Sequence, residues 1–342
     1  MKRFMLLFVA CLIGTAGLAI PAASAADAAA SYPERPVKLV LPYRPGGQSD
    51  LLARKIADLS VKYKLFSQPM VVVSMPGANT RTALRFVQEA DPDGYTLLVH
   101  HSTFLAMHSV GQIPMSFRDY DAVAQAVRMP MASFISLPDA PWKNWKEMIE
   151  YAKKNNKILN IAISGLGGTT HLMYSYITQA TGTADLFRPA FFSGQTESRA
   201  ALMGKKVDAY GDAPAGGIGY VRAGGGKLLI MSDDIRRPDF PDANNFTDFD
   251  IKDLVYMRTG LWAPKGTPPA ILEKLQAVVK KVTETPEFAE YCETQACYPE
   301  YLTGKQYEAQ FDEDEKIFQK LAGDLKKSIE EEQAKQQAAA KQ

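Results

Sequence analysis

The chain alternates short apolar runs with segments in which apolar residues recur every three or four positions. A bounded apolar run of four or five residues is typical of a buried strand, and the longer spacing is typical of an amphipathic helix. A turn rich in glycine, proline, serine or threonine separates the two kinds of segment. The expected strands are 37–41, 70–74, 95–99, 159–163, 188–192, 207–211 and 228–231. The expected helices include 51–63, 80–89, 270–283 and one after residue 170 that carries Leu172, Met173, Tyr176, Ile177 and Ala180 on one face.

Strands that alternate with helices indicate an α/β fold with mostly parallel sheets. Ligands of such sheets bind outside the carboxyl ends of the strands, which is where the polar turns of this chain fall. The segment 138–157 indicates a break between two halves, because two prolines precede a helix whose surface is rich in lysine and glutamate. If a sheet of each half presents its turns to the other, both sets of turns line one site.

The first 25 residues have the pattern of a secretory signal peptide. Lys2 and Arg3 precede an apolar stretch from residue 5 to 20, and a small-x-small cleavage pattern ends at Ala25. We therefore expect export to the periplasm after cleavage near Ala25. The apolar stretch is shorter than the ~20 residues that a membrane-spanning helix needs. Cys11 leaves lipid attachment open as an alternative, although the residues before it fit a lipobox poorly.

The charges of the mature chain nearly cancel. Removal of residues 1–25 takes away two of the 39 basic residues and none of the 38 acidic ones, which leaves a net charge of −1. This balance points to neither nucleic acid nor an anionic membrane as a partner. The length favours two domains over one. The tail 326–342 is rich in Lys, Glu, Gln and Ala and is expected to be a charged helical or disordered end, with a partner-binding role as the alternative.

Two cysteines remain after the signal peptide, Cys292 and Cys297. Their closeness in an exported protein favours a local disulfide, with two buried thiols as the alternative. No histidine lies near them in sequence, so we expect no metal site there. The four histidines of the chain would need three members to converge on a metal ion, and we expect no metal elsewhere either.

The turn from Pro42 to Asp50 is a candidate site for a small anion. It leads from the first strand into a helix, whose first N–H groups have no backbone partner and lie at the positive end of the helix dipole. Gly46 and Gly47 allow the backbone to approach the anion closely. Arg44 either pairs with a carboxylate or points to solvent. Asp50, at the start of the helix, is expected to hold the loop together.

The turn 164–170 is the matching candidate in the second half. Ser164, Thr169 and Thr170 offer hydroxyl donors without adding charge, which suits a carboxylate that must bind and later leave. For these three residues, capping of the helix is the alternative. Asp212 follows another predicted strand and either accepts a hydrogen bond from the ligand or bonds the backbone of its own loop.

Two aromatic residues and two histidines complete the candidates from the residues alone. Tyr43 and Phe192 either cover the apolar body of a ligand or belong to the core. His101 and His171 lie in or just after strand-end turns, so they could meet across a cleft, and His171 could reach a ligand oxygen. The alternative is that each makes one ordinary structural hydrogen bond.

The motifs give little indication of catalysis. The chain has no Gly-x-Ser-x-Gly elbow, phosphate-binding loop or His-Glu-x-x-His motif. The pair Gly165-x-Gly167 lacks the third glycine of a dinucleotide fingerprint. We therefore expect a protein that binds its ligand without transforming it and that uses no cofactor.

Seven motifs occur in a recognisable order. They are Tyr32-Pro33-Glu34-Arg35-Pro36-Val37, Pro42-Tyr43-Arg44-Pro45-Gly46-Gly47-Gln48-Ser49-Asp50, Pro76-Gly77-Ala78, Asp91-Pro92-Asp93-Gly94-Tyr95-Thr96-Leu97-Leu98, Gly168-Thr169-Thr170-His171-Leu172, Val207-Asp208 and Ala263-Pro264-Lys265-Gly266-Thr267-Pro268. Together they resemble the Bug family, the periplasmic solute receptors of tripartite tricarboxylate transporters. The resemblance runs from about residue 32 to residue 325.

The resemblance implies a two-lobed type II periplasmic binding protein of the Venus flytrap kind. The lobes it implies are 31–127 with 256–325, and 128–255. Family members hold a carboxylate mainly with backbone amides and hydroxyls of the strand-end loops. Carried over to this sequence, the first-lobe contacts fall on Tyr43, Arg44, Pro45, Gly46, Gly47, Gln48, Ser49, Pro76, Gly77, Ala78, His101, Ser102 and Thr103. The second-lobe contacts fall on Ser164, Gly165, Thr169, Thr170, Phe192, Ser193, Gly194 and Asp212, and His171 joins the set from its position in the sequence.

Three departures from the family pattern affect the candidate site. Asn79-Thr80 replaces the usual glycine pair after Pro76-Gly77-Ala78, and Ala190-Phe191-Phe192-Ser193-Gly194 replaces the usual Val-Pro-Tyr-Lys-Gly stretch. Arg44 stands where the family mostly has a small residue. The solute of a relative is therefore not transferable to this chain.

The sequence leads to the hypothesis of a monomeric receptor in the periplasm. It captures a small di-, tri- or aromatic carboxylate and delivers it to the subunits of a tripartite tricarboxylate-type membrane transporter. One alternative is a solute-sensing partner of a signalling receptor. The other is a secreted hydrolase that uses Ser164 or His171.

Overall fold

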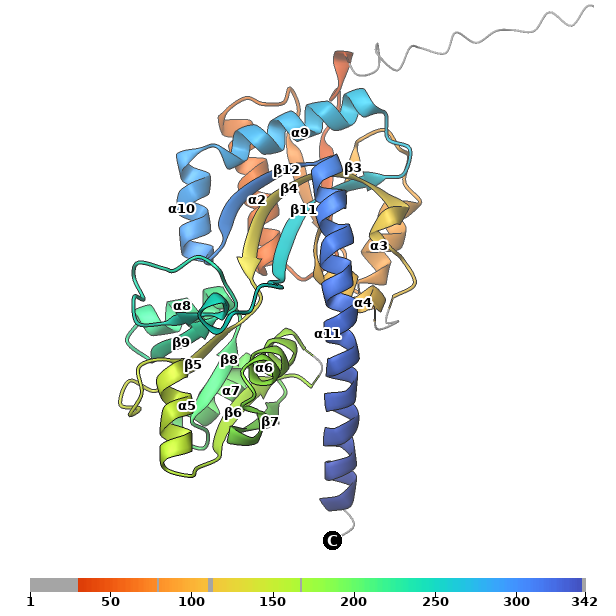
Figure 1. The fold of residues 1–342 in the computed structure, drawn as a ribbon. Helices are drawn as coiled ribbons and strands as arrows, with labels where there is room; N and C mark the ends of the chain where they lie inside the picture. The colour runs from red at the N-terminus through yellow and green to blue at the C-terminus, as the bar shows by residue number, and fades with distance from the viewer. Residues whose placement is uncertain (1–29, 79, 110–112, 167, 340–342) are drawn as a thin grey trace, which may run out of the picture.

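Two six-stranded sheets form the centre of the molecule (Figure 1). The structure is a computed structural model that describes residues 30–78, 80–109, 113–166 and 168–339, so the predicted signal peptide lies outside the described residues. The first sheet has the order β12-β4-β11-β3-β1-β2 and the second β10-β9-β5-β8-β6-β7. The bounds in the first sheet are β1 Val37–Leu41, β2 Met70–Ser74, β3 Thr96–His101, β4 Tyr120–Pro130, β11 Tyr256–Pro264 and β12 Tyr298–Thr303. In the second sheet they are β5 Ser133–Ser136, β6 Leu159–Ser164, β7 Phe187–Phe192, β8 Ala209–Asp212, β9 Lys227–Met231 and β10 Asn244–Asn245.

Helices cover both sheets, and each sheet with its helices is called a lobe below. The helices of the first lobe are α2 Gln48–Lys62, α3 Arg81–Gln88, α4 Thr103–Ser109, α9 Pro269–Thr283 and α10 Pro286–Gln295. Those of the second lobe are α5 Trp145–Lys154, α6 Thr169–Ala180, α7 Gln195–Met203 and α8 Pro214–Arg222. Three short 3₁₀ helices lie at Phe117–Asp119, Ala184–Leu186 and Phe246–Phe249, and α11 Gly304–Ala339 extends past both lobes (Figure 1).

The two-lobed α/β fold expected from the sequence is confirmed, and most strands of each sheet run in one direction, but each sheet also contains antiparallel strands. Strands β1, β2 and β3 are parallel, whereas β11 runs antiparallel to both of its neighbours, β3 and β4. In the second sheet, β5 runs antiparallel to β8 and β9. The physical reason is that the chain enters the second lobe along β4 and returns along β11, so two adjacent strands must run in opposite directions.

The chain passes between the lobes at two places. It leaves the first sheet after Pro130 and enters the second at Ser133, and it returns between β10 and β11. The expected lobe boundary after residue 127 falls inside β4, which continues for three more residues. The expected return at residue 256 coincides with the start of β11.

Helix α11 connects the two lobes along one face. Its side chains Tyr307, Phe311 and Phe318 are buried in an apolar cluster that also contains Trp262 of β11 and residues of the second lobe. The ring centroids of Trp262 and Tyr307 lie 4.7 Å apart. Farther along α11, Ile329 packs against the same cluster. The expected tail 326–342 is therefore helical as far as Ala339, and residues 340–342 lie outside the described residues.

A buried ion pair joins α11 to the returning strand. The Arg258 guanidinium of β11 donates through Nε to the Asp314 carboxylate at 2.9 Å, and the two side chains are 9% and 1% exposed. Nη1 of Arg258 also donates to Glu300 of β12 at 2.6 Å. Gln310 donates to the other oxygen of Asp314 at 2.8 Å, so both partners of the pair have their hydrogen bonds satisfied.

The predicted disulfide between Cys292 and Cys297 is not formed in this structure, in which both are free and buried thiols. Cys292 lies in the last turn of α10, and the Cys297 amide donates to its carbonyl at 3.0 Å to close the helix. The thiols lie in the apolar cluster beneath β1 and α9. A hydrogen bond between them and the burial raise the pKa of Cys292.

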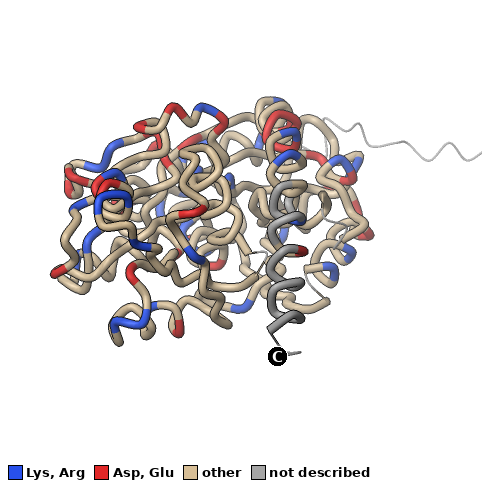
Figure 2. The backbone as a smooth tube through the Cα atoms, turned by 60° about the horizontal axis from the view of Figure 1, so that its bottom comes forward, with Lys and Arg blue, Asp and Glu red and all other residues tan. Residues whose placement is uncertain are grey.

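Basic and acidic residues are interspersed over both lobes (Figure 2), in keeping with a net charge of +1 for the full sequence. Of the helices within residues 30–339 that the structure describes, none has both the length and the apolar character needed to cross a membrane.

Candidate functional site

The predicted loops of the two lobes face each other, because the strand directions require it. Strand β4 runs in the same direction as β1, β2 and β3, and its carboxyl end leads directly into β5. The carboxyl ends of β1, β2 and β3 therefore point toward the second lobe. There, Ser133 at the start of β5 pairs with Asp212 at the end of β8, and β6 and β7 run parallel to β8. The carboxyl ends of all three strands thus point toward the first lobe.

The opening loop is held by Asp50, as expected from the sequence. Its Oδ2 accepts from the Gly46 amide and from Nε of Arg54, both at 2.9 Å. The hydrogen bond from Arg54 is the main cause that lowers the pKa of this carboxyl. Helix α2 begins with Gly47 as its N-cap and has no side-chain cap, so the N–H groups of its first turn are not taken by a capping side chain.

Three side chains of this loop differ in their exposure to solvent and in their hydrogen bonding. Arg44 is exposed, and its guanidinium has neither a hydrogen bond nor an ion pair with a described residue. Nε2 of Gln48 is buried and has no hydrogen-bond partner in the described part of the chain. Ser49 is buried. With respect to the residues that the structure describes, the loop therefore offers one cation without a partner and one unsatisfied amide donor.

Tyr43 packs on a pair of histidines at the end of β3. Its ring stacks on His101 with a centroid separation of 4.9 Å and an angle of 3° between the planes. Its hydroxyl lies 3.5 Å from Nε2 of His100. Burial lowers the pKa of His100 to about 4 and that of His101 well below its usual value, so neither imidazole is charged at neutral pH. This wall of the site is aromatic and neutral.

The other first-lobe candidates have partners of their own. The Ser102 hydroxyl is fully buried, donates to the Tyr256 carbonyl at 2.7 Å and accepts from the Arg258 amide, so it ties β3 to β11. Thr103 Oγ1 lies 2.7 Å from Nδ1 of His101. Pro76, Gly77 and Ala78 form an exposed turn. A ligand can contact the exposed turn 76–78 directly. It can bond to the Ser102 hydroxyl only if the hydrogen bonds of that hydroxyl to Tyr256 and Arg258 are broken.

The second-lobe turn presents a pair of hydroxyl groups. The Thr170 hydroxyl donates to the Ser164 carbonyl at 3.1 Å, and the hydroxyl oxygens of the two residues lie 2.9 Å apart. Because Thr170 has one hydrogen and gives it to the carbonyl, Ser164 is the donor of the second bond. Helix α6 begins at Thr169 and takes Gly168 as its N-cap without a side-chain cap. Capping, the alternative for the threonines, is therefore not their role.

The remaining second-lobe candidates divide into accessible and buried groups. Ser193 is exposed, and Phe192 and Gly194 are half-buried. Gly165 donates to the Phe192 carbonyl at 2.9 Å, which joins the two turns. His171 is fully buried with its ring edge-on to Phe191 at 4.8 Å, and burial lowers its pKa to about 4.

Asp212 lies at the end of β8 but is fully buried and already bonded. Its Oδ2 accepts from Nη2 of Arg199 at 2.7 Å and from the Tyr210 hydroxyl at 2.9 Å, and its Oδ1 accepts from the Ala213 amide at 2.8 Å. Asp212 therefore bonds its own loop, which was one of the two readings of the sequence. Arg199 and Tyr210 were not predicted, although Tyr210 lies two positions before Asp212 in the same strand.

Three helices of the site share one feature. Helices α2, α6 and α7 have the glycines Gly47, Gly168 and Gly194 as their N-caps and therefore have no side-chain cap. Asn144 caps α5 and Thr285 caps α10, whereas α3, α8 and α9 also lack a side-chain cap. The first turn of α2 contains Asp50 and that of α7 contains Glu197, whereas that of α6 has no acidic residue. Since a carboxylate weakens anion binding nearby, α6 provides the most favourable start for an anion.

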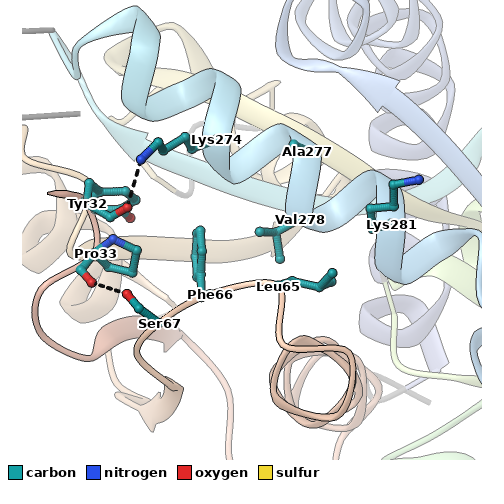
Figure 3. Close-up of a pocket in the computed structure, with 9 residues that line it drawn as sticks. All are labelled: Tyr32, Pro33, Leu65, Phe66, Ser67, Lys274, Ala277, Val278 and Lys281. Atoms are coloured by element: carbon teal, nitrogen blue, oxygen red, sulfur yellow. Dashed lines mark hydrogen bonds between the residues drawn. The ribbon is translucent and has the colours of Figure 1, made fainter. Parts of the chain in front are cut away.

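A separate hollow of about 400 Å³ lies near the amino ends of β1 and β2, at the end of the first sheet opposite the strand-end loops. It is lined by Tyr32, Pro33, Leu65, Phe66, Ser67, Lys274, Ala277, Val278 and Lys281 (Figure 3). Lys274 donates to the carbonyls of Ala30 and Tyr32 at 3.1 Å, and Ser67 donates to the Pro33 carbonyl at 2.6 Å. These residues precede β1 and β2 or belong to α9, so the hollow is not part of the site formed by the strand-end loops.

No cluster of three or more His, Cys, Asp or Glu side chains suited to a metal ion occurs in the described part of the chain. The hydroxyl partner of Ser164 is Thr170, and a threonine hydroxyl does not serve as a general base.

Acid is expected to destabilise the fold, because it protonates histidines that the folded protein keeps neutral. Burial lowers the pKa of His100 and of His171 from 6.5 to about 4. Between these pH values the unfolded chain binds protons that the folded chain does not. The free energy of unfolding therefore falls as the pH falls from 6.5 to 4, by up to about 1.4 kcal/mol per pH unit and histidine. Urea unfolding at a series of pH values measures this slope.

The control for this experiment is His100→Gln, which removes one of the histidines whose pKa burial lowers; His101 and His171 remain. Its slope between pH 6.5 and 4 is expected to be smaller than that of the wild type. The comparison between the two proteins is needed because burial raises the pKa of Asp233 and Asp314, and protonation of these carboxyls acts in the opposite direction. Equal slopes for both proteins would contradict the prediction.

The chain is similar to known proteins both in sequence and in fold. A family model described as the tripartite tricarboxylate transporter family receptor, TctC, matches residues 52–325. A UPF0065 protein of Bordetella pertussis is 31% identical over 303 residues, which cover 87% of this chain and 90% of the relative. A TctC solute-binding protein from Polaromonas, solved with no ligand, has a TM-score of 0.73 at 26% identity, over 85% of this chain and 99% of that one. MatC from Rhodopseudomonas palustris, solved with bound malate, has a TM-score of 0.65 at 25% identity, over 85% and 100% of the two chains.

Proposed function

Because the chain belongs to the tripartite tricarboxylate transporter receptor family, we propose that it is a periplasmic receptor that binds a small organic carboxylate between its lobes and delivers it to a membrane transporter. The observation that carries this proposal is the start of α6. It combines an uncapped first turn, the absence of an acidic residue in that turn and the hydroxyl of Ser164 at the end of β6, which Thr170 of α6 holds in place. Such a start is suited to one carboxylate group.

The carboxylate anchor consists of the first-turn amides of α6 with the hydroxyls of Ser164 and Thr169. The Ser164 hydroxyl can turn from Thr170 to the ligand, while Thr170 keeps its bond to the Ser164 carbonyl. Thr170 therefore positions Ser164 and does not bind the ligand itself. From the first lobe, the unsatisfied amide of Gln48 and the first-turn amides of α2 approach the same ligand.

The body of the ligand and its second polar group face the first lobe. The stack of Tyr43 on His101 offers an apolar, uncharged surface. Arg44 is exposed and unpaired in the described part of the chain, so a second anionic group would gain a charge-assisted hydrogen bond there. The expected class is thus a dicarboxylate or an aromatic carboxylate. The relative MatC, which was solved with malate, supports the dicarboxylate.

Isothermal titration of ligand-stripped protein tests the proposal. The panel contains a monocarboxylate, malate, a longer dicarboxylate and an aromatic carboxylate. At least one compound is expected to bind with a micromolar dissociation constant, which corresponds to about 8 kcal/mol. Arg44→Gln is expected to weaken a dicarboxylate by about tenfold and a monocarboxylate hardly at all. The absence of heat with every compound of the panel would overturn the proposal.

A further inference from the structure

The two lobes also touch on the side of the crossing strands away from the strand-end loops. Glu293 of α10, in the first lobe, accepts hydrogen bonds from two arginines of the second lobe. Nη2 of Arg222 lies 2.9 Å from its Oε1, and Nη2 of Arg237 lies 2.7 Å from the same oxygen. Arg222 ends α8, and Arg237 follows β9. One carboxylate thus bridges the lobes through two guanidinium groups.

The second lobe holds these arginines ready for Glu293. Asp239 accepts from Nη2 of Arg222 at 2.7 Å and lies 3.4 Å from Nε of Arg237. The Arg237 side chain is 6% exposed. Without Glu293, two positive charges would share a single carboxylate, and one of them is buried. The contact with the first lobe therefore balances the charges of this cluster.

An apolar contact accompanies the ionic one. Ile218 of α8, Met231 of β9 and Ala296 at the end of α10 form a small buried cluster of their own. Ala296 has a positive φ of 53° and ends the helix that carries Glu293. The end of α10 thus contacts the second lobe through a charged group and an apolar group, one turn apart.

The strand order places this contact opposite the candidate site. In both sheets the crossing strands separate two groups of elements. On one side lie β12 and α10 of the first lobe with β9 and α8 of the second. On the other side lie β3, β1 and β2 of the first sheet, which face β8, β6 and β7 of the second. In Figure 1, α10 lies above α8 on the left, and α4 and α6 lie to the right of the crossing strands. A rotation about the crossing segments that brings the strand-end loops together therefore moves α10 away from α8.

We propose that Glu293, bound by Arg222 and Arg237, stabilises the open arrangement of the lobes and so weakens ligand binding without touching the ligand. The proposal rests on the proposed function in one respect, namely that the ligand binds between the lobes. The apparent affinity of such a receptor is its intrinsic affinity reduced by the fraction of molecules that can close. Loss of the Glu293 contact increases that fraction.

The test is the variant Glu293→Gln, which keeps the shape of the side chain and removes its charge. Its dissociation constant for malate, measured by isothermal titration, is expected to be roughly twofold to fivefold lower than that of the wild type. Its urea midpoint is expected to be lower. Arg222→Gln is expected to act in the same direction, and the double variant is expected to show less than the product of the two effects.

The matched control is Glu287→Gln on the same helix. Glu287 bonds to Lys62 and Tyr63, which belong to the first lobe, so the charge change is the same but no contact between lobes is lost. Its affinity for malate is expected to equal that of the wild type. A Glu293→Gln variant with unchanged or weaker affinity would overturn the proposal, since a merely structural role does not tighten binding.

A measurement without ligand separates this proposal from the proposed function. A nitroxide at Thr196→Cys, in the exposed first turn of α7, broadens the amide resonances of the first-lobe loops when the lobes close. Glu293→Gln is expected to increase this broadening in the ligand-free protein, and Glu287→Gln is not. If malate gives no heat with the wild type, the broadening alone decides, and equal broadening in all three proteins would refute the role of Glu293.

Discussion

Replacement of Asp314 with alanine is expected to lower the free energy of unfolding by about 3–5 kcal/mol. Asp314 is 1% exposed and accepts from the Arg258 guanidinium, which is 9% exposed, at 2.9 Å. Without the carboxylate, the guanidinium stays buried with Glu300 as its remaining carboxylate partner. The cost is large because a buried charge loses a partner and has little access to water in exchange. Urea unfolding at pH 7 measures it.

An exposed ion pair on the same helix provides the control. Asp312 pairs with Arg118, and the two side chains are 50% and 53% exposed. Asp312→Ala is therefore expected to cost less than about 1 kcal/mol. The double replacement Arg258→Met with Asp314→Leu is expected to recover part of the lost stability, because no buried charge remains. If Asp314→Ala and Asp312→Ala lowered the free energy of unfolding equally, burial would not increase the contribution of the Arg258–Asp314 pair to stability.

Ser164→Ala is expected to weaken carboxylate binding by about tenfold to a hundredfold. In this structure the Ser164 hydroxyl donates to Thr170, 2.9 Å away, and it is the donor that can turn to a ligand. A hydrogen bond to a charged group contributes about 1.5–3 kcal/mol, which corresponds to this range of affinity. The dissociation constant for the tightest carboxylate of the panel is the quantity to measure.

Two further variants distinguish the donor from its support. Thr170→Val removes the group that positions Ser164 and is expected to weaken binding by less than Ser164→Ala does. Ser198→Ala removes a hydroxyl that donates to the Gly194 carbonyl within the start of α7, and it is expected to leave the affinity unchanged. An affinity of Ser164→Ala equal to that of the wild type would place the carboxylate elsewhere.

The sequence predicted the strands whose residues are apolar and uninterrupted. Strands β1 and β2 begin and end at the predicted residues, and β9 begins one residue early. Strands β4 and β12 were not predicted, because Gln125 and Arg128 interrupt the apolar run of β4. Nε2 of Gln125 and Nε of Arg128 instead contact Glu300 of β12, at 2.5 and 3.2 Å, which is far away in the sequence. Local patterning cannot reveal a partner of that kind.

The site shows the same division between local and distant information. The starts of α2, α6 and α7 follow from the strand, turn and helix pattern, and the structure brings their turns to facing edges of the two sheets. The bonds of Ser102 to Tyr256 and of Asp212 to Arg199 join residues from separate elements, so the sequence could not exclude these two side chains. The ligand-binding residues themselves stay predictions until a complex is measured.

The position of α11 at the end of the chain also determines when the core can be completed. Tyr307, Phe311 and Phe318 fill the space beside Trp262 and β4, yet they are synthesised after every strand of both sheets. A nascent chain that stops short of them leaves this apolar surface in water, at a cost of about 25 cal/mol per Å². The first lobe therefore reaches its folded form only after nearly the whole polypeptide has emerged. Such late completion is compatible with the export across a membrane that the first 25 residues predict.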